Sequence, residues 1–68
     1  MILTDELKGL ISKMGMSQRQ VAKQLGITEK TFYLKMKRGV FGSDEIEAMI
    51  DILEIEDPIS IFFAKHVT

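Results

Sequence analysis

The side chains best placed to recognise another molecule lie along residues 29–38, and they differ in hydrogen-bonding character. If this stretch is a helix, each residue turns by about 100°, so one outward face carries acidic, phenolic, aliphatic and ammonium side chains together. These are Glu29, Lys30, Tyr33, Leu34 and Lys37. Such a face can recognise the base edges of the DNA major groove, which present acceptors, donors and the thymine methyl group.

Each of these five side chains has a reading role and a simpler alternative. Lys30 and Lys37 can donate to guanine O6 and N7, or can be solvated surface charges. Glu29 can accept from cytosine N4, or can be a first-turn acid at the positive end of the helix dipole. Leu34 can pack on a thymine methyl group, or can be an incidental exposed apolar residue. Tyr33 can pack against the groove wall or donate to a phosphate.

Basic and hydroxyl side chains around this stretch are expected to contact the DNA backbone. A helix that starts at Gln18 presents free backbone N–H groups, which favour a phosphate. The residues predicted to contact phosphate are Ser17, Gln18, Arg19, Lys23, Lys35, Arg38 and Ser43. Asp44 and Glu45 follow Ser43 directly and oppose close phosphate approach there.

The charge of the chain is divided between its two parts. Residues 1–38 carry eight basic and three acidic side chains, a net charge of +5, whereas residues 39–68 carry one lysine and seven acids, a net charge of −6. The total of −1 therefore hides a strongly basic half. This distribution indicates one face that meets a polyanion and one that faces away from it, and an ordinary mixed surface is the simpler alternative.

Side chains that would support catalysis or bind a metal are scarce. The chain has no cysteine and one histidine, His66, which lies near the end of the sequence with no nucleophile or carboxylate fixed beside it. The acids of residues 44–54 are spread along one side of an expected helix, which is typical of a solvated face. We therefore expect no catalytic residue, no metal, no cofactor and no small-molecule substrate.

Length and composition indicate one globular domain, residues 1–68. A hydrophobic content of 46% is too high for a disordered chain. The first residues lack a basic region followed by an apolar run, and no apolar run approaches the roughly 20 residues that span a bilayer. We expect a cytoplasmic protein with no membrane contact.

Two short helices must position the outward face, and the first is predicted over residues 18–25. Ser17 is a good N-cap, because its hydroxyl oxygen can accept from a free N–H of the first turn. Gln20 lies three residues later and completes a capping box. Gly26 can adopt the left-handed conformation that ends a helix. Ala22 provides the small side chain that a close helix crossing needs.

The second helix of the pair is predicted over residues 29–38. Thr28 is its N-cap and Gly39 its stop. Only Gly26, Ile27 and Thr28 link the two helices, and a link this short that contains glycine is typical of a helix-turn-helix.

Three further helices are predicted around this pair. They span about residues 5–14, 44–54 and 58–64. Their expected N-caps are Thr4, Ser43 and Asp57. Gly9 indicates a close contact of the first helix with another helix. The side chains expected to face inward are Leu3, Leu7, Leu10, Ile11, Met14, Val21, Ala22, Leu25, Phe32, Met36, Phe41, Ile46, Met49, Ile50 and Leu53.

The order of these elements resembles the lambda-repressor-like DNA-binding domains. More narrowly, the short Cro- and repressor-type regulators of temperate phages and prophages are similar in MSQRQVAKQLGITEKTFYLKMKRG, in Phe41-x-x-x-Glu45-Ile46, in Glu56-Asp57-Pro58 and in the Ile61-Phe62-Phe63 ending. The resemblance implies a compact all-α domain of five helices with the helix-turn-helix as its second and third. It further implies a transcription regulator that reads double-stranded operator DNA in the cytoplasm of a bacterial host, associated with the nucleoid.

A homodimer on a two-fold symmetric operator is expected, and its contact surface is sought in the last helix and the tail. The residues predicted for that contact are Ile59, Ile61, Phe62, Phe63 and Val67. Alternatively, Phe62 or Phe63 closes the small core and the chain stays monomeric until it meets DNA. A different class of function is also open: a protein-interaction module of the same fold, in an antirepressor, antitoxin-like or adaptor role, that uses its acidic half.

Overall fold

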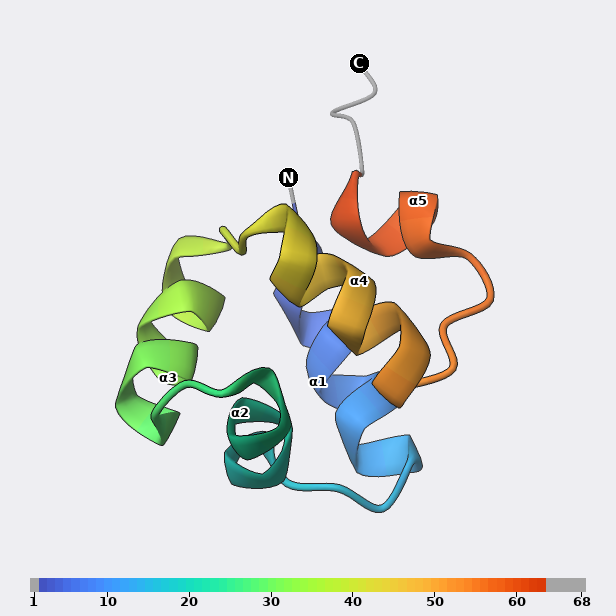
Figure 1. Ribbon diagram of the computed structural model, residues 1–68. Helices are drawn as coiled ribbons and strands as arrows, with labels where there is room; N and C mark the ends of the chain where they lie inside the picture. The colour runs from blue at the N-terminus through green and yellow to red at the C-terminus, as the bar shows by residue number, and fades with distance from the viewer. Residues whose placement is uncertain (1, 64–68) are drawn as a thin grey trace.

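Residues 2–63, the part of the chain that the computed structural model describes, contain five helices joined by short loops (Figure 1). Their bounds are α1 Thr4–Lys13, α2 Gln18–Leu25, α3 Glu29–Arg38, α4 Ser43–Ile52 and α5 Pro58–Phe62. α2 packs on α3 and α4, whereas α1 packs on α2 and α5. The all-α prediction is confirmed for the described residues, and α2 and α3 begin and end where they are predicted to.

Local hydrogen bonds define both ends of α2. The Ser17 hydroxyl oxygen accepts from the backbone N–H of Gln20 at 3.1 Å, and the Gln20 side-chain oxygen accepts from the backbone N–H of Ser17 at 2.8 Å. The predicted capping box is therefore present. At the other end Gly26 has a φ of 76°, the left-handed conformation that ends the helix.

A pair of threonines caps α3. The Thr28 hydroxyl oxygen accepts from the backbone N–H of Thr31 at 3.1 Å, and its O–H donates to the Thr31 hydroxyl oxygen at 2.9 Å. Gly39 ends the helix with a φ of 70°. Ala22 is buried in α2, so a small side chain does lie on the packed side of that helix.

α1 begins one residue earlier than predicted, and the prediction that Thr4 caps it is wrong. Its N-cap is Leu3, and no side chain accepts a capping hydrogen bond. The Leu3 backbone N–H donates to the Ile61 carbonyl oxygen at 2.8 Å, and the Leu3 carbonyl oxygen accepts from the Leu7 N–H at 3.0 Å. A contact with α5 therefore fixes the residue before α1, and this long-range contact decides where the helix starts.

The start of α4 also differs from the prediction, since its N-cap is Gly42 and Ser43 is its first residue. The Glu45 carboxylate reaches back and accepts from the Gly42 backbone N–H at 2.7 Å. A Cβ atom on Gly42 would lie 2.8 Å from a carboxylate oxygen of Asp44 and 3.4 Å from one of Glu45. The missing side chain at Gly42 therefore leaves room for these acids over the first turn.

α4 stops at Ile52, two residues before the predicted end. Glu54 has a left-handed φ of 50°, which is uncommon for a residue with a side chain. The next residue, Ile55, is buried, and its backbone N–H donates to the Ile50 carbonyl oxygen at 3.0 Å. The early stop thus turns the chain so that Ile55 joins the core.

α5 begins as predicted and is short. Asp57 caps it by accepting from the Ser60 backbone N–H at 3.3 Å, and Pro58 occupies the first helical position. The helix ends at Phe62. Residue 64, the predicted end, lies outside the described residues.

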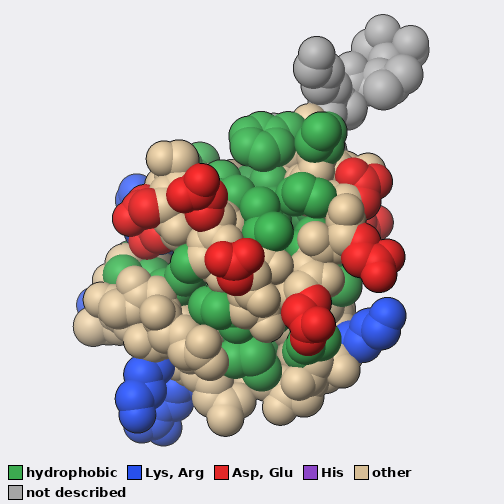
Figure 2. Space-filling model, turned by 45° about the vertical axis from the view of Figure 1, so that its right-hand side comes forward, with side chains coloured by type: hydrophobic (Ala, Val, Ile, Leu, Met, Phe, Trp, Pro, Cys, Tyr) green, Lys and Arg blue, Asp and Glu red, His purple; other side chains and the backbone are tan. Residues whose placement is uncertain are grey.

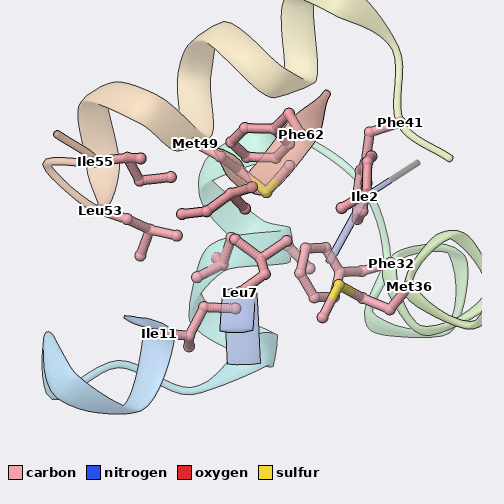
Figure 3. Packing of buried hydrophobic residues seen from close by; sticks show 13 residues of the cluster. Ile2, Leu7, Ile11, Phe32, Met36, Phe41, Met49, Leu53, Ile55 and Phe62 are labelled. Carbon is pink, nitrogen blue, oxygen red and sulfur yellow. The ribbon is translucent and has the colours of Figure 1, made fainter. Parts of the chain in front are cut away.

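One hydrophobic core lies among the helices (Figure 3). Its buried members are Ile2, Leu7, Ile11, Val21, Ala22, Phe32, Met36, Phe41, Met49, Leu53, Ile55, Ile61 and Phe62. Phe32 of α3 is fully buried, and its ring centroid lies 5.5 Å from that of Phe41, which enters from the segment between α3 and α4. These two rings anchor the inner side of α3, so its opposite side faces outward.

Gly9 makes no close helix contact, which contradicts the prediction. A Cβ atom placed on it would meet nothing within 4 Å. Because glycine in a helix interior costs roughly 0.5–1 kcal/mol relative to alanine, we expect Gly9→Ala to raise the free energy of unfolding by about that amount. Urea unfolding measures this change. Gly39→Ala is the matched control and should lower stability, because its φ is 70°. A loss of stability in Gly9→Ala would contradict the structure.

Candidate nucleic-acid interface

A hollow of about 560 Å³ lies between the first turns of α2 and α3. We name it the α2–α3 hollow, and it is lined by Ser17, Gln18, Arg19, Glu29, Lys30 and Tyr33. The first three of these residues are predicted phosphate contacts and the last three are predicted base-reading residues. The fold thus brings members of both sets to one place.

Backbone N–H groups add positive partial charge to the α2–α3 hollow. A helix leaves its first four N–H groups without a partner inside the helix. The capping box of α2 satisfies those of Ser17 and Gln20, so those of Gln18 and Arg19 remain for an outside acceptor. The Thr28 cap of α3 likewise bonds the backbone N–H of Thr31 and leaves those of Glu29 and Lys30 for an outside acceptor. Two positive helix ends and the charges of Arg19 and Lys30 therefore line one hollow, in which the Glu29 carboxylate is the one acidic group among the described residues.

The outward face of α3 is the predicted one. Its exposed residues include Glu29, Lys30, Tyr33, Leu34 and Lys37. Tyr33 is 61% exposed and Leu34 is 42% exposed, whereas Phe32 on the opposite side is fully buried. Exposed aromatic and aliphatic side chains between lysines form a surface that can contact both apolar and anionic groups.

A second, smaller hollow of about 200 Å³ lies between α1 and α3. We name it the α1–α3 hollow, and it is lined by Thr4, Lys8, Tyr33, Met36 and Lys37. Tyr33 lines both hollows. Lys8 is absent from the predicted site residues. Its helical register indicates that it faces outward but does not indicate that α3 is the neighbour beside it.

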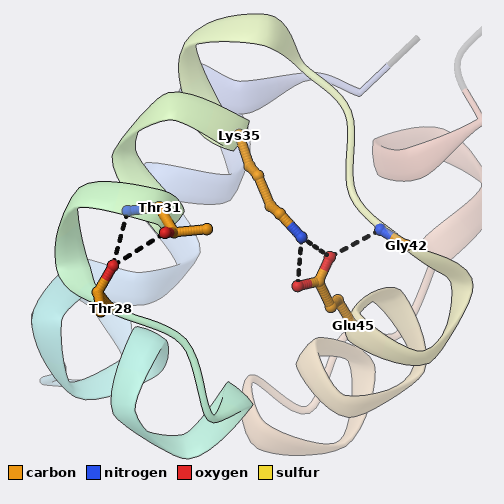
Figure 4. A network of polar contacts seen from close by, with 5 residues as sticks. All are labelled: Thr28, Thr31, Lys35, Gly42 and Glu45. Atoms are coloured by element: carbon orange, nitrogen blue, oxygen red, sulfur yellow. Dashed lines mark hydrogen bonds and ion pairs between the residues drawn. The ribbon is translucent and has the colours of Figure 1, made fainter.

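Lys35, a predicted phosphate contact, is paired with an acid of α4 (Figure 4). Its ammonium nitrogen donates to both carboxylate oxygens of Glu45, at 2.7 and 2.6 Å. The Glu45 side chain is 9% exposed and the Lys35 side chain 32%. Because Glu45 also accepts from Gly42, this contact joins the middle of α3 to the start of α4. The charge of Lys35 is thus largely compensated within the protein.

The remaining predicted phosphate residues do not line the α2–α3 hollow. Lys23 and Arg38 are exposed and line neither of the two hollows. Ser43 lines a different hollow of about 530 Å³, whose other lining residues are Phe41, Ile46, Glu47, Ile50 and Phe63. We name it the α4–Phe63 groove. Ser43 lines neither of the two basic hollows.

The set predicted for a dimer contact divides into buried and exposed residues. Ile61 and Phe62 are 8% and 2% exposed, so they belong to the core of their own chain, and the expectation that they face a second copy is wrong. Ile59 and Phe63 are 69% and 56% exposed. Val67 lies outside the described residues. Figure 2 shows hydrophobic side chains gathered on the face of α4 and α5, with acidic side chains around them.

Further features of residues 2–63 concern membrane-spanning helices and groups of metal-binding side chains. Across these residues, no helix is both long and apolar enough to cross a membrane. Within the same range, no three His, Cys, Asp or Glu side chains lie close enough together to hold a metal ion. Comparisons of the chain with models of protein families, with curated proteins and with solved structures found no match.

Proposed function

We propose that this chain is a sequence-specific DNA-binding transcription regulator of the helix-turn-helix type, resembling the Cro and repressor proteins of phages and prophages. The observation that carries the proposal is the α2–α3 hollow, where two helix N-termini, Arg19 and Lys30 line one exposed concavity. In this arrangement α2 and α3 are the helix-turn-helix, and α3 enters the major groove, which is wide enough for one α-helix.

Phosphate contacts come from the first turn of α2. The free N–H groups of Gln18 and Arg19 point the positive end of the helix dipole at an anion, and the Arg19 guanidinium adds a full charge. The Ser17 hydroxyl accepts from Gln20 and still has its own O–H to donate. These contacts set the register of the protein on the duplex and carry no sequence information themselves. Lys35 and Ser43 leave the phosphate set, because Lys35 is paired with Glu45 and Ser43 lies in the α4–Phe63 groove.

Base contacts come from residues 29–34 of α3. Lys30 donates to guanine O6 and N7, Glu29 accepts from cytosine N4, and Leu34 packs on a thymine methyl group. Glu29 and Lys30 line the hollow beside the phosphate contacts, so the reading and positioning groups are neighbours. This proximity supports base recognition over the alternative of unrelated surface charges.

A homodimer completes the proposal, since two copies on a two-fold symmetric operator read half-sites about one helical turn apart. Its contact surface is narrower than the sequence predicts and centres on Ile59, Phe63 and the α4–Phe63 groove. Phe63 is more than half exposed although it lines an apolar concavity with Ile46 and Ile50. Concentration-dependent sedimentation of the free chain tests whether the dimer forms before it binds DNA.

The protein-interaction module remains the second candidate function. The observation that favours it is the same α4–Phe63 groove, which lies on the acidic half of the chain and would bind an apolar segment of another protein. The two functions differ in their response to salt. Phosphate binding releases counterions and weakens steeply with salt, whereas apolar docking does not.

Lys30→Ala tests the reading role of α3. If Lys30 contacts a base, the variant should bind its operator about 1–3 kcal/mol more weakly, or roughly 5- to 150-fold, with little change on random DNA. The operator is first obtained by selecting bound fragments from random DNA and sequencing them. Lys13→Ala is the matched control, since Lys13 is exposed on α1 and lines neither basic hollow. Equal losses on operator and random DNA would instead assign Lys30 to a phosphate.

A further inference from the structure

The α1–α3 hollow contains basic side chains that the proposed base contacts of Glu29, Lys30 and Leu34 do not include. Lys8 of α1 and Lys37 of α3 line it together, and no acidic side chain does. Within residues 2–63 no ion pair joins either ammonium group to a carboxylate, since the ion pair found there is that of Lys35 with Glu45. Two ammonium groups that line one concavity, with no described acidic side chain in that lining, both attract an anion placed between them.

We propose that the α1–α3 hollow is a second phosphate-binding site, in which Lys8 and Lys37 hold one phosphate group of the DNA backbone. This inference rests on the proposed function. Thr4 lies one turn before Lys8 on α1 and lines the same hollow, so its hydroxyl group can donate to the same phosphate. The hollow's volume of about 200 Å³ makes it the smaller of the two basic hollows.

In this site Lys37 contacts a phosphate and positions the protein on the DNA, whereas the sequence alone predicts that it contacts a base. Lys37 lies in the last turn of α3, whereas a recognition helix reads bases mainly with its N-terminal residues. Lys30 and Glu29 occupy those N-terminal positions and line the other hollow. Sequence information therefore comes from the start of α3, and the end of α3 grips the backbone together with α1.

Tyr33 borders both sites, because it lines both hollows and is 61% exposed. Phosphates bound in the two hollows fix the tilt of α3 in the groove, because two anchoring points restrict rotation more than one. α1 thereby becomes part of the DNA-binding surface.

The test compares Lys8→Ala with Lys13→Ala, which removes the same charge from the same helix outside the hollow. Affinity for one DNA duplex is measured by titration at several salt concentrations for the full chain and both variants. The slope of log K against log salt should become shallower for Lys8→Ala, by at most about 0.9 because Lys37 still contacts the same phosphate, and should stay unchanged for Lys13→Ala. Thermal unfolding checks that both variants remain folded.

Lys37→Ala adds a second readout. It should weaken binding to the selected operator and to random DNA by the same factor, in contrast to Lys30→Ala. Equal slopes for Lys8→Ala and Lys13→Ala would overturn the second site while the unchanged chain still binds DNA in a salt-dependent way. Loss specific to the operator in Lys37→Ala would also overturn it. Failure of the unchanged chain to bind any DNA would overturn the proposed function and this inference together.

Discussion

Phe32→Ala should lower the free energy of unfolding by about 3–5 kcal/mol, the usual cost of removing a buried aromatic side chain. Phe32 is 0% exposed, and the centroid of its ring lies 5.5 Å from the centroid of the Phe41 ring. Neighbouring helices cannot collapse fully into the space, so the loss includes both the transfer of the ring and the cavity left behind. Since a single core in a chain below about 70–80 residues rarely supplies more than about 3–5 kcal/mol of stability, the variant should be partly unfolded at 37 °C. Urea unfolding measures the loss.

Phe63→Ala is the control for this prediction, because the same ring is removed from a side chain that is 56% exposed. A surface substitution of this kind changes stability by about 0.5 kcal/mol or less. Equal losses in the two variants would contradict the core described for α3. Phe32→Ala should also abolish DNA binding above its melting temperature, whereas Phe63→Ala should weaken binding only through the dimer.

Gly26→Val should lower the free energy of unfolding by about 3 kcal/mol, the upper end of the cost of a left-handed residue with a side chain. Gly26 has a φ of 76°, and a Cβ atom there would meet nothing within 4 Å. The cost is therefore backbone strain and not a clash with neighbours. Valine is branched at Cβ and tolerates this conformation poorly.

Gly26→Asn separates strain from crowding, because asparagine adopts the left-handed conformation more readily than other residues with side chains. Because open space surrounds Gly26, backbone strain decides the cost, and asparagine should cost clearly less than valine. Chemical denaturation of the two variants gives the comparison. An unchanged melting temperature in Gly26→Val, or an asparagine variant less stable than the valine one, would show that the turn between α2 and α3 is built differently.

The sequence predicts the ends of a helix correctly where residues close to those ends determine them. The bounds of α2 and α3 are predicted without error, because Ser17, Gln20, Thr28 and their closing glycines act within a few residues. The start of α1 is missed, because it depends on the hydrogen bond from the Leu3 N–H to the Ile61 carbonyl oxygen, far along the chain. Sequence patterns indicate caps and turns that form within a few residues. They do not indicate which distant residues pair through a hydrogen bond.

The start and end of α4 are missed for related reasons. Ser43 is an acceptable N-cap, yet the side chain of Glu45 bonds Gly42 and Lys35 and thereby fixes the preceding residue as the cap. Nothing in the amino-acid type of Glu54 marks its left-handed conformation, which follows from the burial of Ile55.

The candidate site follows the same rule. Residues whose position depends on one helical register, such as Lys30 and Tyr33, face outward as predicted. Contacts that depend on a neighbouring helix are not predicted: Lys35 pairs with Glu45 of α4, and Lys8 lines a hollow that α1 and α3 form together. Helical register places Lys35 on a different side of α3 from Lys30, but it does not identify Glu45 as its partner.

The most direct test of the central claim is a titration of the unchanged chain with double-stranded DNA at a series of salt concentrations. We expect log K to fall linearly with log salt, with a slope of about −0.9 for each phosphate neutralised. Selection and sequencing of the bound fragments should then yield a short inverted repeat. The absence of binding at low salt, or binding that does not respond to salt, would contradict a DNA-binding function and favour the protein-interaction module.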